Sequence, residues 1–266
     1  FNEAVSASGN AAENIVVSPY SAGMALSMLA EGAAGDTKAE LVSALKNASY
    51  SGDILESGDG CIISSANSVW IRSGFPVLPG YASLLKNAYS AEIAERDFSV
   101  PATVKEINKW CSNKTAGRIP QIIDEISPDQ VMFLLNALYF KGQWKYQFDK
   151  KETTDKTFHN IDGTTSDVKM MHQEGKLLCW SGEKMDVAEF PYGNETFCMD
   201  VILPHEGESI DNCLKGIDYV KMYDILHNMN FRNAYIDMPR MQLDYDRTLN
   251  ADLIAMGMPD AFDIQK

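Results

Sequence analysis

The chain has 266 residues, of which 45% are hydrophobic and 23% charged, an ordinary composition for a globular protein with a substantial apolar core. Its 23 basic and 37 acidic residues give a formal charge of −14, which repels phosphate backbones, so we expect no nucleic acid partner. No apolar run approaches the length that spans a bilayer, so no membrane partner is predicted either.

Two helices are predicted near the start of the sequence. Ser18 followed by Pro19 favours a helix beginning there, since serine caps free amides and proline suits the first turn. Its apolar stripe is Met24, Ala25, Met28 and Leu29. After Gly32 and Gly35, Asp36 is predicted to cap a second helix, with Leu41, Ala44 and Leu45 on one face. Phe1 has the character of a residue inside an earlier helix, so we expect the natural start and any targeting signal to precede it.

The middle of the chain predicts a strand, a helix and a second, longer strand. The first strand runs from about Cys61 to Ile71, and the helix carries Val104, Ile107 and Cys111 on one face and ends before Gly117. The long strand, Val131 to Phe148, is so apolar that we expect both of its faces to be covered, and we expect it at the centre of a large sheet and not at an edge. Asn136 lies in the middle of this strand, where a polar side chain costs free energy unless partners satisfy it. It is a candidate structural lock.

Short strands separated by Gly and Asn turns follow, as in antiparallel sheets. They are predicted at 157–158, 167–171, 177–180, 187–190 and 197–203. No repeat or linker divides the sequence, so residues 1–266 are interpreted as a single α+β domain.

No catalytic or metal-binding pattern is found. Neither Ser18 nor Ser21 lies in a G-x-S-x-G turn, and the four histidines are too scattered to form a ligand set. The five cysteines have no C-x-x-C spacing, which favours buried free thiols over a disulfide framework. We therefore predict a protein that is not an enzyme and has neither a cofactor nor a metal site.

The pattern L-x-N-A-x-Y-F-K-G-x-W-x-x-x-F, from Leu134 to Phe148, resembles the third strand of the central sheet in the serpins, the serine protease inhibitor superfamily. The resemblance recurs in order along the whole chain. Its other segments are NIVVSPYS (14–21), GAAGDT (32–37), INKWCSNKTAGRIPQII (107–123), VKMM (168–171), AEFPYG (188–193), MDVILP (199–204) and MPRMQLDYDRTLNADLIAMGMPDAF (238–262). The last of these looks like a strand followed by a helix.

This resemblance implies a serpin fold, in which a layer of several helices packs on a large central β-sheet with two further, mostly antiparallel sheets. The family continues beyond the point matched by Lys266, through a small-residue hinge, the reactive loop and further core strands. We therefore expect a single serpin domain that is truncated at both ends, with the reactive loop outside this sequence.

The family's mechanism gives roles to residues that match its motifs. In an inhibitory serpin, a target serine protease cleaves the reactive loop, which then inserts as a strand into the central sheet and traps the protease as a covalent acyl-enzyme. Ser18, Pro19, Ser21 and Asn136 resemble the shutter, which governs strand separation. Trp144 resembles the breach residue where the loop enters, although simple core packing is an open alternative. The helix that crosses the sheet is represented by Ile107, Asn108, Trp110, Thr115 and Gly117.

Other functions stay open within this family. A non-inhibitory serpin acting as a chaperone, carrier or storage protein is one alternative, and an inhibitor of cysteine proteases is another. The stretch from Leu45 to Gly60 holds Lys46 as its one basic residue, so no heparin activation is expected. We expect a monomer that is extracellular or at the cell surface, with the cytoplasm as the alternative.

Overall fold

The computed structural model describes residues 14–45 and 60–263. The helix expected around Phe1 lies outside these residues, as does nearly all of the stretch expected to lack a heparin site. The described elements are α2 Pro19–Gly32, α3 Gly35–Ala44, β1 Cys61–Arg72, α4 Pro79–Ala88, β2 Glu92–Arg96, α5 Pro101–Lys114, β3 Met132–Gly142, η1 Lys150–Glu152, β4 Thr154–His159, β5 Thr165–Ser181, β6 Met185–Pro191, β7 Cys198–Pro204, α6 Ile210–Leu214, α7 Tyr219–His227, β8 Asn230–Pro239, α8 Asn250–Ala255 and η2 Asp260–Phe262.

The first two described helices begin in different ways. Ser18 caps α2 as predicted, because its side-chain oxygen accepts a hydrogen bond from the Ser21 N–H at 3.2 Å. The prediction that Asp36 caps α3 is wrong. That helix begins at Gly35 with Ala34 in the cap position and no side-chain cap, and Asp36 lies inside the first turn. Its charge can still favour the helix there, through the positive end of the helix dipole.

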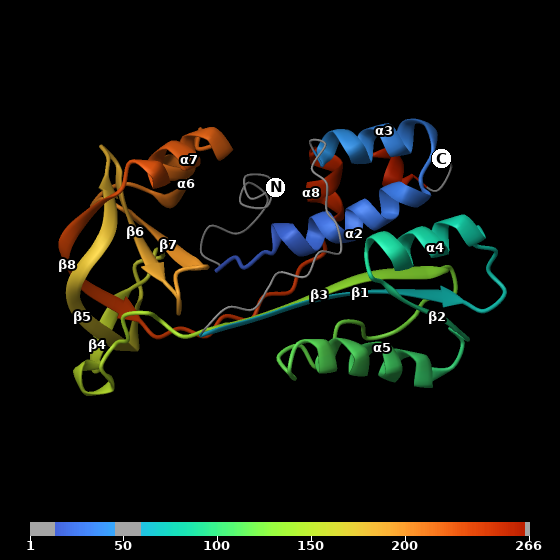
Figure 1. The fold of residues 1–266 in the computed structure, drawn as a ribbon, viewed down its shortest axis with the longest axis horizontal. Coiled ribbons are helices and arrows are strands. Elements are labelled where there is room, and N and C mark those ends of the chain that lie inside the picture. Colours follow the sequence, from blue (N-terminus) through green and yellow to red (C-terminus); the bar gives the residue numbers. More distant parts are fainter. Residues whose placement is uncertain (1–13, 46–59, 264–266) are drawn as a thin grey trace.

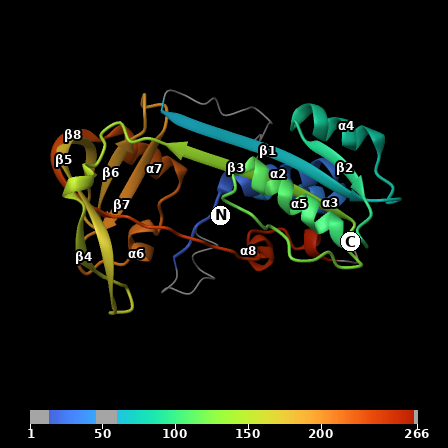
Figure 2. The same cartoon turned by 90° about the horizontal axis from the view of Figure 1, so that it is seen from below.

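Three strands form a sheet in the order β2-β1-β3, with β1 parallel to β2 and antiparallel to β3. β1 and β3 run side by side over most of their length (Figure 2). Successive side chains of β1 point to opposite faces. Val69 packs with α2 residues such as Met28 on one face, and Trp70 packs with α5 residues such as Ile107 on the other. The sheet is therefore enclosed between α2 and α5 (Figure 1).

The placement of β3 corrects the prediction in one respect. Both of its faces are covered, as the apolar sequence requires, yet among the described strands β3 lies at the edge of the sheet and pairs with β1 alone. Apolar composition indicates covered faces and says nothing about a neighbour in the hydrogen-bonding direction. The strand also ends at Gly142, short of the predicted Phe148.

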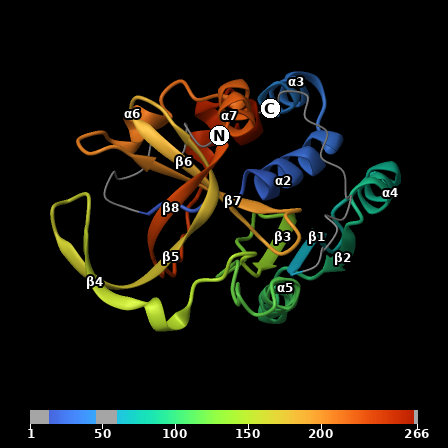
Figure 3. The same ribbon diagram turned by 60° about the vertical axis from the view of Figure 1, so that its left-hand side comes forward.

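The second sheet is antiparallel and has the strand order β4-β5-β6-β7, with β8 also paired to β5. The separate strands predicted at 167–171 and 177–180 are one strand, β5, which has 17 residues. It pairs with β4 and β8 and then, at its end, with β6, so the described strands form one antiparallel sheet where the resemblance implied two (Figure 3). α6 and α7 cover one end of this sheet through Cys213 and Ile225, which pack against Val187.

The segment after β8 differs from the strand and helix expected over 238–262. β8 ends at Pro239 and α8 begins at Asn250, while residues 240–249 belong to no helix or strand. No described strand lies paired beside them, so their backbone lacks the partner that a strand requires. Among the helices that the structure describes, none has the length and apolar character to cross a membrane.

Candidate functional site

Asn136 belongs to a small cluster of polar side chains between β3 and β1. It lies directly opposite Asn67 in the antiparallel register, which brings the two side chains together. Its side-chain amide donates hydrogen bonds to the Asn67 Oδ1 at 2.9 Å and to the Ser65 Oγ at 3.1 Å. The Asn136 Oδ1 is buried and has no hydrogen-bond partner among the described residues. Asn136 thus has a buried partner in Asn67 and a half-buried one in Ser65, while its own Oδ1 has no partner among the described residues.

Asn67 is a functional candidate that sequence reasoning missed. It is 4% exposed, and its Nδ2 donates to the backbone carbonyl of Tyr89 at 2.7 Å. The available signal was a single amide shortly before the apolar run that begins at Val69. That signal was weak, because the register that places Asn67 opposite Asn136 joins residues far apart in the sequence.

The expected shutter residues fall into two groups. Ser18 and Ser21 form one, in which the Ser18 hydroxyl donates to the Ser21 Oγ at 2.9 Å and Pro19 starts α2. α2 packs against β3, which carries Asn136 of the other group. No hydrogen bond among the described residues joins the two groups. The structure therefore brings the serines to the same layer as Asn136 without linking them to it directly.

All the residues expected on the helix that crosses the sheet lie on α5 or just after it. Ile107 is 0% exposed and, with Trp110, packs against Trp70 of β1 and Ala137 of β3. Asn108 ties the helix to the following loop, since its Oδ1 accepts from the amides of Ile122 and Ile123 at 2.9 and 3.0 Å and its Nδ2 donates to the Ile123 carbonyl at 2.8 Å.

The end of α5 is fixed by Thr115 and Gly117. The Thr115 hydroxyl donates to the Cys111 carbonyl at 2.9 Å and accepts from the Ile119 amide at 3.0 Å. Gly117 has a φ of +77°, which a residue with a side chain rarely adopts, and its amide donates to the Ser112 carbonyl at 2.7 Å. These contacts close the last turn of the helix and turn the chain toward β3.

Trp144 lies just beyond β3 and connects the two sheets. It forms a β-bridge with Tyr192, and their rings stack with centroids 4.4 Å apart and an angle of 14°. Phe148 and Phe190 contact the same indole edge to face. The place of Trp144 between the two sheets fits the expected breach position, and its aromatic contacts equally fit the alternative of core packing.

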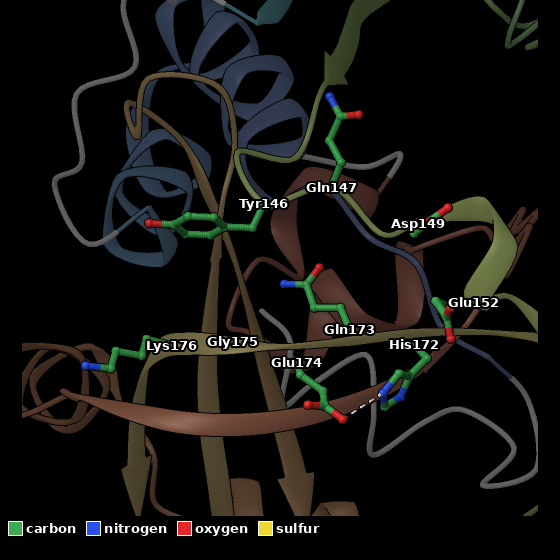
Figure 4. A pocket seen from close by; sticks show the side chains of 9 residues that line it. All are labelled: Tyr146, Gln147, Asp149, Glu152, His172, Gln173, Glu174, Gly175 and Lys176. Atoms are coloured by element: carbon green, nitrogen blue, oxygen red, sulfur yellow. Dashed lines mark ion pairs between the residues drawn. The ribbon is translucent and has the colours of Figure 1, made fainter.

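A pocket of about 720 Å³, lined largely by residues with polar side chains, lies between β5 and the segment that follows Trp144 (Figure 4). Its lining residues are Tyr146, Gln147, Asp149, Glu152 and 172–176. His172 contacts Asp237 of β8 through Nδ1 at 2.7 Å, while its Nε2 lies 3.6 Å from Glu174. Because both ring nitrogens face carboxylates, this histidine is placed for charge pairing and not for activating a nucleophile.

The charge pairs of His172 predict a pH-dependent stability. The hydrogen bond to Asp237 raises the pKa of His172, and the nearby Glu174 raises it further. A raised histidine pKa stabilises the fold at pH values below the unfolded pKa of about 6.5, and this stabilisation is lost as the pH rises through the folded pKa. We expect His172→Gln to lower the melting temperature at about pH 6 and to have progressively less effect as the pH rises to about 8.

Thermal melts of the His172→Gln variant and of the unsubstituted protein across this range test the expectation. The matched control is His159→Gln, since His159 is exposed on β4 and its side chain has no hydrogen bond or ion pair among the described residues. A difference in melting temperature for His172→Gln that does not vary with pH would contradict the assignment.

One group of described side chains has the composition of a metal site. Glu189, Cys198 and Asp200 place their ligand atoms within 4.8 Å of one another on β6 and β7. Partial desolvation of the thiol and the two neighbouring carboxylates raise the pKa of Cys198 to about 12, although the residue as a whole is exposed. The thiol therefore stays protonated at neutral pH, and the metal-binding thiolate is disfavoured. None of the five cysteines forms a disulfide, and Cys61, Cys111 and Cys213 are buried as predicted, whereas Cys198 is exposed.

Comparisons with known proteins assign nearly the whole chain to one family. The family model described as "Serpin (serine protease inhibitor)" matches residues 2–266. The chain is 32% identical over 263 residues to an uncharacterized serpin-like protein of Thermococcus kodakarensis, covering 94% of this chain and 61% of the relative. It is 31% identical over 279 residues to the leukocyte elastase inhibitor of Homo sapiens, covering 97% of this chain and 74% of that protein.

Solved structures have the same fold. The native state of tengpin, a thermophilic serpin, superposes with a TM-score of 0.89 at 28% identity, covering 97% of this chain and 69% of that structure. Its latent state superposes with a TM-score of 0.91 at 29% identity, covering 99% and 75%. The α+β fold expected from the resemblance is confirmed. The chain spans 61% of the length of the Thermococcus relative, so it corresponds to a part of such a protein.

Proposed function

Because the chain belongs to the serpin family, we propose that it is part of a serine protease inhibitor that acts as a suicide substrate. The protease serine attacks a carbonyl carbon of the reactive loop, the peptide bond breaks, and the loop stays attached to the enzyme as an ester. Insertion of the loop into the sheet then prevents hydrolysis of that ester. The chain itself supplies no catalytic group to this reaction.

The observation that carries the proposal is the family match over residues 2–266, together with 31% identity to the leukocyte elastase inhibitor of Homo sapiens over 74% of that protein. β3, with 11 residues and helices on both faces, is the strand beside which the loop would insert. An inserted strand of roughly ten residues that gains about 0.5–1.5 kcal/mol for each hydrogen bond would release on the order of 10 kcal/mol. A gain of this size is comparable with the stability of a whole domain and makes trapping effectively irreversible.

The site residues receive roles in this proposal. Ser18, Pro19 and Ser21 at the start of α2, together with Asn136 on β3, form the shutter, and Trp144 forms the breach where the loop first enters. α5 crosses one face of β1 and β3 and has to yield while a strand inserts beside β3. Its anchors Ile107 and Asn108 are the contacts that resist this movement.

The test is to mix the complete gene product with trypsin-like, chymotrypsin-like and elastase-like serine proteases and to look for a covalent complex that survives SDS. We expect a complex with at least one of them, and the name of the human relative makes an elastase-like enzyme the first choice. The same protease with its catalytic serine replaced by alanine is the control, since it cannot form the ester. Mass analysis of the released peptide would locate the cleaved bond.

Two alternatives are separate outcomes of the same test. Clean cleavage of the loop without a complex would overturn the inhibitor proposal in favour of a non-inhibitory serpin. A complex with a cysteine protease alone would indicate a cross-class inhibitor. We further propose a monomer that is extracellular or at the cell surface, with the cytoplasm as the alternative. The absence of disulfides among the five cysteines is compatible with either compartment.

A further inference from the structure

α4 ends in a carbonyl group that its own helix does not satisfy. The last carbonyls of a helix have no intrahelical donor. At the end of α4, Ser90 has a φ of 50° and the Ala91 amide turns back to the Leu85 carbonyl at 3.2 Å. The carbonyl of Tyr89, a residue only 6% exposed, then points at β1, where the Asn67 side chain donates to it at 2.7 Å. Asn67 therefore caps this helix from the neighbouring sheet.

The same Asn67 side chain also holds β3. Its Oδ1 accepts the hydrogen bond from the Asn136 Nδ2 at 2.9 Å, while its Nδ2 is committed to Tyr89. A side-chain amide can donate and accept at once, which neither a carboxylate nor an aliphatic side chain can do. A continuous polar path thus runs from β3 through β1 to the end of α4, inside a layer where unpaired polar groups are costly.

We propose that Asn67 is a positioning residue that makes β3, β1 and α4 move as one unit. Separation of β1 from β3 would break the hydrogen bond between Asn67 and Asn136, and separation of β1 from α4 would break the one between Asn67 and Tyr89. The use of this coupling in strand insertion rests on the proposed inhibitory function. The coupling itself rests on the two hydrogen bonds of Asn67 alone.

Hydrogen exchange of the complete gene product tests the coupling without any protease. In Asn67→Leu the Tyr89 carbonyl and the Asn136 amide both lose a buried partner. We expect amide exchange in the last turn of α4 and in the centres of β1 and β3 to become faster together, by roughly 10- to 100-fold. Exchange in β6 and β7, which belong to the other sheet, is expected to stay unchanged.

Tyr89→Phe is the matched control. It removes the hydroxyl that donates to Glu31 at 3.3 Å and keeps the backbone carbonyl that Asn67 binds. We expect it to leave exchange in β3 unchanged. The proposal is overturned if Asn67→Leu and Tyr89→Phe change exchange in β3 alike, or if Asn67→Leu affects β1 and leaves both α4 and β3 as they are.

The Asn67→Asp variant gives a pH dependence of exchange protection that is not expected if Asn67 only fills space. A charged aspartate can accept from Asn136 and cannot donate to Tyr89, whereas a protonated carboxyl can do both. We expect the exchange protection of this variant to approach the unsubstituted protein, compared at the same pH, as the pH falls from about 7 to about 4. A protection deficit that is the same at every pH would count against the proposal.

The covalent-complex assay distinguishes failure of the proposed inhibitory function from failure of the proposed coupling. If the unsubstituted protein forms no protease complex while Asn67→Leu still uncouples α4 from β3, the inhibitory function fails and the coupling stands. If complexes form while exchange in α4 and β3 is unaffected by Asn67→Leu, the coupling fails and the inhibitory function stands.

Discussion

Replacing Asn136 by alanine is expected to release the sheet from its native arrangement. The substitution removes the donor to the Asn67 Oδ1 and to the Ser65 Oγ, and so leaves a buried acceptor on β1 without its partner. An unsatisfied buried polar group costs about 1–3 kcal/mol, a large share of the stability of a typical domain. In the complete protein we expect Asn136→Ala to convert to latent or polymerised forms during prolonged mild heating.

Size-exclusion chromatography and native gels after heating measure this conversion, and thermal melts measure the loss of stability. Ser65→Ala is a useful comparison, because it removes one hydrogen bond of Asn136 and leaves the one to Asn67 in place. We expect it to convert more slowly than Asn136→Ala. Unchanged monomer for Asn136→Ala after heating would show that Asn136 is not a lock.

The sequence was sufficient to single out Asn136, because an amide inside an apolar strand has to be satisfied. It was not sufficient to name the partners. Ser65 and Asn67 lie about seventy residues earlier, and their contact with Asn136 depends on the register of β1 against β3. A shift of one residue in that register would have turned Asn67 to the other face. A single sequence does not specify the register of β1 against β3 directly.

Strand faces were predicted better than strand edges. The apolar character of β3 correctly implied that both faces are covered, whereas its place at the edge of the described strands depends on backbone pairing, which the side-chain pattern does not specify. The predicted break in β5 had a different cause. His172 to Lys176 is polar and contains Gly175, as a turn would be, yet β8 pairs along this segment and Asp237 satisfies His172. Polar cross-strand pairs allow the strand to continue there.

For α5, the helix across the sheet, the residues expected from the sequence motif are also the ones that the structure places together. Ile107, Asn108, Trp110, Thr115 and Gly117 were expected to belong together, and the structure places all of them on α5 or at its end. The periodicity of Val104, Ile107 and Cys111 gave the buried face of the helix. The loop contacts of Asn108 were not foreseen, since they depend on how the chain folds back after Gly117.

Truncating Ile107 to alanine should therefore weaken both the fold and the hold of α5 on the sheet. Ile107 is 0% exposed and packs against Trp70 of β1 and Ala137 of β3. Removing a buried aliphatic side chain of this size costs about 2–5 kcal/mol, through lost burial and the cavity that remains. Chemical denaturation should show a loss of this order, whereas Lys109→Ala, at an exposed position of the same helix, should change the free energy of unfolding by less than about 0.5 kcal/mol.

The proposed inhibitory function also predicts an effect of Ile107→Ala on the rate of protease trapping, which destabilisation of the fold alone does not predict. If α5 has to yield while a strand inserts beside β3, a helix held less tightly opposes insertion less. Ile107→Ala should then trap protease at least as fast as the unsubstituted protein, per folded molecule, although its free energy of unfolding is lower. Trapping that slows in step with the lost stability would mean that α5 supports insertion. The helix would then be a structural support of the sheet, and the resistance to insertion would have to lie at the shutter or the breach.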